Sequence, residues 1–158
     1  MSKTRIMVVD DELIIRESLA GWLERDGHHV ETAASGEQAL ELAGKTDIDG
    51  VVLDLKMHGI GGIETCRRLR ATERHRVTPI LVLTAMDQRE ALSEAFEAGC
   101  DDFISKPIEP AVLQTRIKGH LHRAALAKQL ERVRRNLNRY VSPRLQQMVV
   151  QYSDTGAL

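Results

Sequence analysis

Five short, predominantly apolar runs, each followed by a stretch of helical spacing, constrain this chain more than any other feature. The runs are Arg5–Val9, His29–Thr32, Gly50–Asp54, Ile80–Thr84 and Asp102–Ser105. Such runs are typical of strands buried on both faces, and their alternation with helices favours parallel pairing. We therefore predict an α/β fold in which helices cover both faces of a doubly wound parallel sheet.

Apolar side chains at helical spacing fill the stretches between these runs. They lie in Leu13–Leu23, Ala39–Ala43, Ile63–Arg70 and Ala91–Phe96, and a fifth helix is predicted to begin near Ala111. Four apolar residues of that fifth helix are expected to pack on the sheet. They are Val112, Leu113, Ile117 and Leu121.

The fifth predicted helix continues beyond the length that covering the sheet requires. Its later apolar residues are spaced by 4, 3, 4 and 3 positions, which is a heptad seam of about two repeats. The seam consists of Leu126, Leu130, Val133, Leu137 and Tyr140. Two heptads are marginal for an independent coiled coil, so a helix end that frays in solution is the alternative. Proline disfavours helical geometry in the preceding residue, so Ser142–Pro143 predicts the end of the helix.

Length and composition limit the class of protein. The chain has 158 residues, 42% of them hydrophobic, which suits one soluble domain with an appendage and excludes a large multidomain enzyme. Apolar runs such as Ile80–Leu83 are far shorter than the roughly 20 residues that cross a bilayer. The start of the chain turns acidic too early for a signal peptide, so we expect a cytoplasmic protein. Two cysteines are too few for a disulfide framework.

Charge is distributed unevenly along the chain. Residues 1–110 carry 13 Lys and Arg against 21 Asp and Glu, a balance of −8. Residues 111–150 carry nine Lys and Arg and only Glu131 as an acid. An acidic body with a basic tail is compatible with binding to nucleic acid, to an anionic surface, or to an acidic partner such as a second copy.

Polar side chains stand at the ends of four of the five predicted strands. Asp10 and Asp11 follow the first strand, Asp54 ends the third, Thr84 ends the fourth, and Lys106 follows the fifth. The carboxyl ends of parallel strands converge at one edge of a doubly wound sheet. We therefore expect three carboxylates, a hydroxyl and an ammonium to lie together.

Three neighbouring carboxylates repel one another, and a hard divalent cation such as Mg²⁺ relieves that repulsion. A cation, an ammonium and a hydroxyl around one carboxylate suit the transfer of a phosphoryl group to it, and Asp54 is the expected nucleophile. A free-standing Mg²⁺-dependent phosphohydrolase is the rival enzyme class. Its usual nucleophile and acid lie two residues apart, and the adjacent pair Asp10 and Asp11 does not match that arrangement.

Four segments at these strand ends carry a family resemblance. They are Val8–Glu12, Leu53–Met57, Leu83–Ala85 and Phe103–Pro107. In this order and approximate spacing they resemble the receiver domain of two-component (phosphorelay) response regulators. The resemblance covers about residues 4–122 and implies a flavodoxin-like five-stranded sheet of strand order 2-1-3-4-5.

The resemblance also implies a domain organisation. We expect the receiver domain over residues 1–122, a helical or coiled-coil signalling extension over 123–141, and a linker or disordered tail over 142–158. Residues 136–143 further resemble the helical linkers that precede class III nucleotide cyclase domains. The chain is therefore expected to precede an output domain in a longer protein.

Site residues of the family carry over to matching positions of this sequence. Asp54 corresponds to the phosphoacceptor, which takes a phosphoryl group from a sensor histidine kinase or a phosphotransfer protein. Asp11, Asp54 and the backbone carbonyl of Lys56 correspond to the direct Mg²⁺ ligands, with Asp10 acting through water.

Three further positions match residues that respond to the phosphoryl group. Thr84 corresponds to the switch hydroxyl, Phe103 to the switch aromatic and Lys106 to the phosphate-binding lysine, and the Lys106–Pro107 bond is expected to be cis. Two positions depart from the family pattern. His58 stands where a rigid proline is usual, and Phe103 lacks the hydroxyl of the usual tyrosine.

These residues imply a phosphorylation-activated switch and not an enzyme with turnover; only self-phosphotransfer and slow autodephosphorylation are expected. Phosphorylation is expected to change the face formed by the fourth helix, fifth strand and fifth helix. We expect a homodimer through that face and the C-terminal helix.

The alternative function is a nucleic-acid-binding regulator that uses the basic C-terminal helix. The basic side chains are expected to spread around the helix, and the sequence has no helix-turn-helix or other recognisable nucleic-acid-binding motif. Both observations argue against direct nucleic-acid binding. The basic side chains are those of Lys128, Arg132, Arg134, Arg135 and Arg139.

Overall fold

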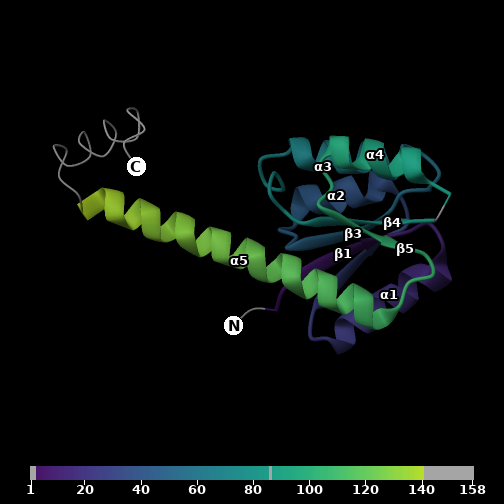
Figure 1. Ribbon diagram of the computed structural model, residues 1–158, viewed down its shortest axis with the longest axis horizontal. Coiled ribbons are helices and arrows are strands. Elements are labelled where there is room, and N and C mark those ends of the chain that lie inside the picture. The colour runs from purple at the N-terminus through teal and green to yellow at the C-terminus, as the bar shows by residue number, and fades with distance from the viewer. Residues whose placement is uncertain (1–2, 86, 141–158) are drawn as a thin grey trace. The chain divides into compact units, whose positions relative to one another are not determined.

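The computed structural model describes residues 3–85 and 87–140, and ten helices and strands alternate along them (Figure 1). In order they are β1 Arg5–Val9, α1 Leu13–Arg25, β2 His29–Ala33, α2 Gly36–Lys45, β3 Gly50–Asp54, α3 Gly61–Ala71, β4 Ile80–Thr84, α4 Arg89–Ala98, β5 Asp102–Ser105 and α5 Pro110–Tyr140. All neighbouring strands pair in parallel, in the order β2-β1-β3-β4-β5. The predicted doubly wound, flavodoxin-like α/β fold is confirmed.

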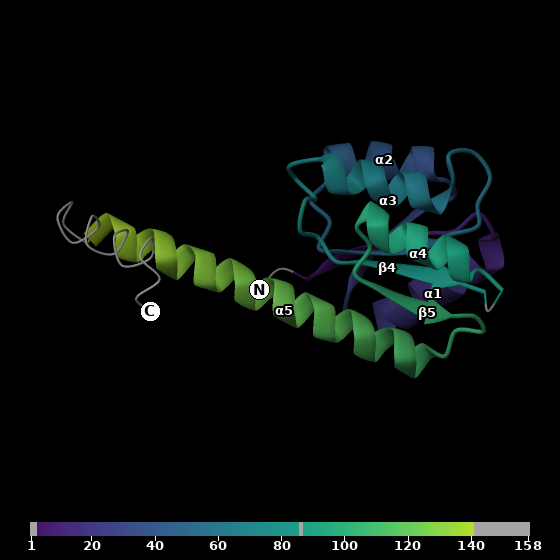
Figure 2. The ribbon, with the colours of Figure 1, turned by 45° about the horizontal axis from the view of Figure 1, so that its top comes forward.

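Successive side chains of each strand face opposite sides of the sheet, and each side has its own helices. Met7 and Val9 of β1 lie in a buried cluster with side chains of α2, α3 and α4. Ile6 and Val8 lie in a second buried cluster with side chains of α1 and of the first turns of α5. Figures 1 and 2 show these two helical layers on either side of the sheet. Because helices cover both faces of the sheet, the polar side chains expected to form the site lie at the ends of the strands.

Two residues that helical spacing assigned to the buried stripes are exposed. Leu13 is the first residue of α1, and Phe96 lies in α4. The Phe96 ring meets that of Phe103 edge to face, with centroids 6.3 Å apart. Periodicity shows which face of a helix is apolar but not how much of each side chain on that face the fold covers.

The long helix α5 contributes to two compact units, Met1–Ala124 and Ala125–Leu158. In the first unit, Leu113 and Ile117 are fully buried, as predicted. In the second unit, the described residues of the predicted seam are exposed in the single chain. These are Leu126, Leu130, Val133 and Leu137.

Part of the sequence prediction lies outside the described residues. The side chain of Tyr140, the expected helix end at Ser142–Pro143 and the expected tail over 142–158 belong to it. Within 3–85 and 87–140, no helix combines the length and the hydropathy that crossing a membrane requires.

His75 lies buried in the loop between α3 and β4. Its Nε2 accepts a hydrogen bond from the backbone N–H of Ile48 at 3.3 Å, so this nitrogen carries no proton. Burial lowers the pKa of His75 below its usual 6.5, the charge of Arg74 lowers it further, and Asp47 opposes both effects. Protonation would remove the acceptor and leave a positive charge in the interior.

We predict that His75 makes the fold less stable as the pH falls below about 6.5. In that range the unfolded chain gains a proton on His75, while the folded chain gains it only at the lower, folded-state pKa. His75→Gln keeps a side-chain acceptor and should remove the His75 contribution from the pH dependence. Two contributions remain in both proteins: His28, whose pKa burial also lowers, and Asp10, whose pKa burial raises to about 6 and which acts in the opposite direction. Urea denaturation between about pH 7.5 and 5.5 measures the effect, with the exposed His29→Gln as control. An unchanged pH dependence in His75→Gln would contradict this account.

Candidate functional site

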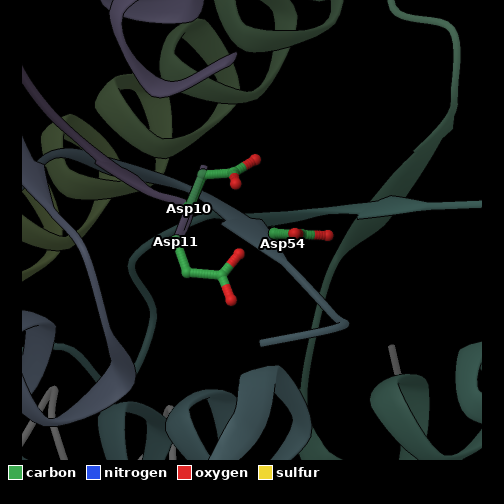
Figure 3. Close-up of side chains that lie close together, drawn as sticks. All are labelled: Asp10, Asp11 and Asp54. Atoms are coloured by element: carbon green, nitrogen blue, oxygen red, sulfur yellow. The ribbon is translucent and has the colours of Figure 1, made fainter. Parts of the chain in front are cut away.

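The carboxyl ends of β1 and β3 bring three carboxylates together (Figure 3). Asp10 and Asp11 follow β1, and Asp54 is the last residue of β3. One carboxylate oxygen of each lies within 4.8 Å of the other two. The expected proximity of these three side chains is observed.

Asp10 is fully buried. Its Oδ1 accepts a hydrogen bond from the backbone N–H of Glu12 at 2.9 Å, whereas its buried Oδ2 has no partner within the described part of the chain. Burial raises the pKa of Asp10 to about 6; the Glu12 N–H opposes this rise, the charge of Asp54 adds to it, and Lys106 opposes it. The site therefore contains a carboxylate oxygen without a compensating donor.

Asp54 is almost fully buried, with 2% of its surface exposed, and it has a cationic partner. The ammonium of Lys106 donates to Asp54 Oδ1 at 3.1 Å, and the backbone N–H of Lys56 approaches the same oxygen at 3.4 Å. Burial raises the pKa of Asp54, the contacts with Lys106 and Lys56 lower it, and the charge of Asp11 raises it again. Lys106 thus offsets one of the three charges.

The donor set fits Mg²⁺. This ion prefers hard oxygen ligands and binds through one or two carboxylates with water in its remaining positions. Three carboxylate oxygens of Asp10, Asp11 and Asp54 lie close enough to share one ion, and Asp10 also has a buried oxygen that no described residue contacts. These three residues could hold the cation.

The other predicted residues lie at the ends of β4 and β5. Thr84 is buried at the end of β4, and its Oγ1 lies 3.1 Å from the Ala85 carbonyl oxygen and 3.3 Å from Gln88 Oε1. Phe103 is partly buried in β5, and the Lys106–Pro107 bond is cis, as the resemblance implied. The hydroxyl contacts of Thr84 are therefore within its own loop.

Hydrogen bonds hold the loop between β3 and α3, where His58 replaces the usual proline. The His58 N–H donates to Asp11 Oδ2 at 3.3 Å, a bond that proline cannot form. Glu37 of α2 accepts a hydrogen bond from the Ile60 N–H at 2.8 Å. Gly59 has a φ of +78°, and a Cβ at this position would lie 2.6 Å from the Glu37 carboxylate. Hydrogen bonds thus link this loop to Asp11 and to α2.

Sequence reasoning missed Glu37 and Gln88. The one local signal for Glu37 is the capping box of α2, in which the Gln38 N–H donates to Ser35 Oγ at 3.1 Å and Gln38 Oε1 accepts from the Ala34 N–H at 2.7 Å. Because Ser35 and Gln38 form this box, the Glu37 carboxylate can accept a hydrogen bond from the loop that contains Ile60. No pattern in the sequence points to Gln88.

The basic side chains of α5 are arranged differently from the expectation. Arg132, Arg135 and Arg139 line one shallow pocket together with Asn136. Spacings of three and four residues place side chains on the same side of a helix. The expectation that the basic residues spread around the helix was therefore wrong for these three.

Comparison with known proteins agrees with this geometry. The family model of the response regulator receiver domain matches residues 6–118. The transcriptional regulatory protein ResD of Bacillus subtilis is 40% identical over 124 residues, which are 78% of this chain and 50% of ResD. The response regulator MprA of Mycobacterium leprae is 41% identical over 119 residues, which are 75% of this chain and 51% of MprA. The chain spans about half the length of these curated relatives.

Solved structures show the same fold. The chemotaxis response regulator CheY4 of Vibrio cholerae has a TM-score of 0.72 and 30% identity, over 75% of this chain and 99% of CheY4. NtrX of Brucella abortus has a TM-score of 0.77 and 26% identity, over 84% of this chain and 30% of NtrX. The chain thus belongs to the response regulator receiver domain family of two-component systems.

Proposed function

We propose that this chain is a phosphorylation-activated switch with Asp54 as its phosphoacceptor. The observation that carries the proposal is the environment of Asp54: a buried carboxylate at a strand end, within 4.8 Å of two others and bonded to the ammonium of Lys106. A carboxylate so placed has a nucleophilic oxygen and a neighbouring cation for the charge of an incoming phosphoryl group.

In the proposed reaction, an Asp54 oxygen attacks the phosphorus of a phosphohistidine on a sensor kinase or phosphotransfer protein. The bond between phosphorus and the donor ring nitrogen breaks as the new phosphorus–oxygen bond forms. Lys106, already 3.1 Å from Asp54 Oδ1, is positioned to contact the transferred group. Asp11, Asp54 and the Lys56 carbonyl would hold Mg²⁺, with Asp10 acting through water. When bound, the ion supplies positive charge against the phosphoryl oxygens.

The proposed response moves from Asp54 to the α4-β5-α5 face. A phosphoryl group adds about −1.5 to −2 charges. Thr84 would turn its hydroxyl toward that group, and the Phe103 ring would move inward, away from its contact with Phe96. Arg116 of α5 donates to the Phe103 carbonyl at 2.5 Å, so β5 and α5 are linked. A change at Phe103 would therefore reach β5 and α5 of this face.

The proposed readout is a homodimer through the α4-β5-α5 face and the seam of α5. Leu130, with 71% of its surface exposed, occupies heptad position a in this seam. The basic residues Lys128, Arg132, Arg135 and Arg139 then occupy the outer positions c and f, so they do not face each other across a two-stranded seam. We also propose that a longer form of the protein carries a C-terminal output domain, because the chain covers half the length of its relatives.

A second candidate function is nucleic-acid binding by α5. The shared pocket of Arg132, Arg135 and Arg139 favours it, since clustered arginines can neutralise neighbouring phosphates. Binding to DNA or RNA that weakens steeply with salt and disappears on truncation after Leu121 would support this candidate. Absence of such binding in the full chain would remove it.

We predict that a small phosphodonor with Mg²⁺ adds one phosphoryl group to the wild type. Asp54→Asn lacks the nucleophile and should gain none, and omission of Mg²⁺ should suppress the reaction. The control Asp47→Asn, at a side chain that is 88% exposed, should react like the wild type. Intact-mass spectrometry measures the addition; a phosphoryl group on Asp54→Asn or none on the wild type would refute the assignment.

We predict that the seam mediates association. The wild type should change its size on phosphorylation, whereas Leu130→Asp should stay a monomer in both states because it places a charge at an apolar seam position. Ala125→Asp introduces the same charge at the outer position c and should behave like the wild type. Light scattering at several protein concentrations measures the masses. Equal association of Leu130→Asp and wild type would exclude the seam as the interface.

A further inference from the structure

Gln88 lies at the end of the loop between β4 and α4 and bonds back to the start of that loop. Its Oε1 accepts a hydrogen bond from the backbone N–H of Ala85 at 3.0 Å, and its own backbone N–H donates to the Ala85 carbonyl at 3.1 Å. A backbone N–H can only donate, so the side-chain atom that faces it must be the amide oxygen. The backbone thus fixes the orientation of the Gln88 amide.

The same oxygen lies 3.3 Å from Thr84 Oγ1. Because an amide oxygen only accepts, the Thr84 hydroxyl must be the donor in this contact. A second acceptor, the Ala85 carbonyl oxygen, lies 3.1 Å from the hydroxyl. The hydroxyl has one proton, and while either loop oxygen receives it, that proton is not directed to a group on Asp54.

We propose that Gln88 is a positioning residue that stabilises the resting orientation of the Thr84 hydroxyl. When Thr84 turns toward a phosphoryl group, it loses the contact with Gln88, whereas Gln88 keeps its bond to Ala85. Gln88 therefore contributes to the free-energy difference between resting and activated states, and does so through Thr84. This inference rests on the proposed function and adds to it a residue that regulates the same site.

The expected size of the effect follows from the contact. One neutral hydrogen bond contributes modestly to stability, so removing its acceptor should shift the equilibrium toward the activated state by about 2- to 10-fold. A ligand that binds the activated state gains apparent affinity as that state becomes more populated.

Beryllofluoride with Mg²⁺, which imitates a phosphoryl group on a carboxylate, is the probe. Gln88→Met has a side chain of similar length without the acceptor and should bind the probe about 2- to 10-fold more tightly than the wild type. Gln38→Met is the matched control, because Gln38 Oε1 accepts from the Ala34 N–H at the start of α2 and is not bonded to Thr84. It should bind like the wild type.

A double-mutant cycle with Thr84→Val separates positioning from support of the loop. Valine keeps the shape of threonine without its hydroxyl, so Gln88→Met should have no further effect in this background. If Gln88 only closed the loop, Gln88→Met would change the affinity for the probe equally in the wild-type and Thr84→Val backgrounds. Thermal unfolding confirms that each variant is folded.

The outcomes distinguish this inference from the proposed function. Unchanged affinity in Gln88→Met, or an equal change in the Thr84→Val background, would overturn the positioning role. If Asp54→Asn still abolished binding of the probe, the proposed function would stand. Absence of Asp54-dependent binding in the wild type would overturn the proposed function and the role of Gln88 with it.

Discussion

Burial of Asp10 and Asp54, together with the mutual repulsion of Asp10, Asp11 and Asp54, is the constraint on which the site depends. β1 and β3 are adjacent in a sheet buried on both faces, so the fold holds the three carboxylates together whatever their charge. Lys106 offsets the charge of Asp54, but Asp10 has a buried oxygen without a partner among residues 3–85 and 87–140, and its pKa is raised to about 6. The packed core thus maintains an unfavourable arrangement at its edge. The proposed cation would relieve it.

The fold could be predicted closely because strands buried on both faces appear in the sequence as short apolar runs. Four strands have the predicted bounds, and β2 ends one residue later, at Ala33, which is buried and paired with Val9. Helix limits and exposure were less predictable. Leu13 and Phe96 fit an apolar period, yet both are exposed, and the Phe96 ring meets that of Phe103 in β5.

The candidate site was predictable where residues stand at strand ends and unpredictable where loops meet. Topology alone brings Asp10, Asp11 and Asp54 together. Two hydrogen bonds depend on how the loops are arranged in space, and the spacing of residues in the sequence does not predict them. They join Glu37 to the Ile60 N–H and Gln88 to the Thr84 hydroxyl. Gly62 is a further case: a Cβ there would lie 2.3 Å from the Asp54 carbonyl oxygen, so the close approach of α3 to β3 requires this glycine.

The free energy of unfolding of wild type and Asp10→Asn, with and without Mg²⁺, tests the central claim most directly. Asparagine keeps the acceptor for the Glu12 N–H and removes a buried charge. Without Mg²⁺ near pH 7, Asp10→Asn should therefore be more stable than the wild type by about 1 to 3 kcal/mol. Mg²⁺ should stabilise the wild type and stabilise Asp10→Asn less. A less stable Asp10→Asn in the absence of Mg²⁺, or a wild type indifferent to the ion, would contradict the claim that burial and repulsion of these carboxylates govern the site.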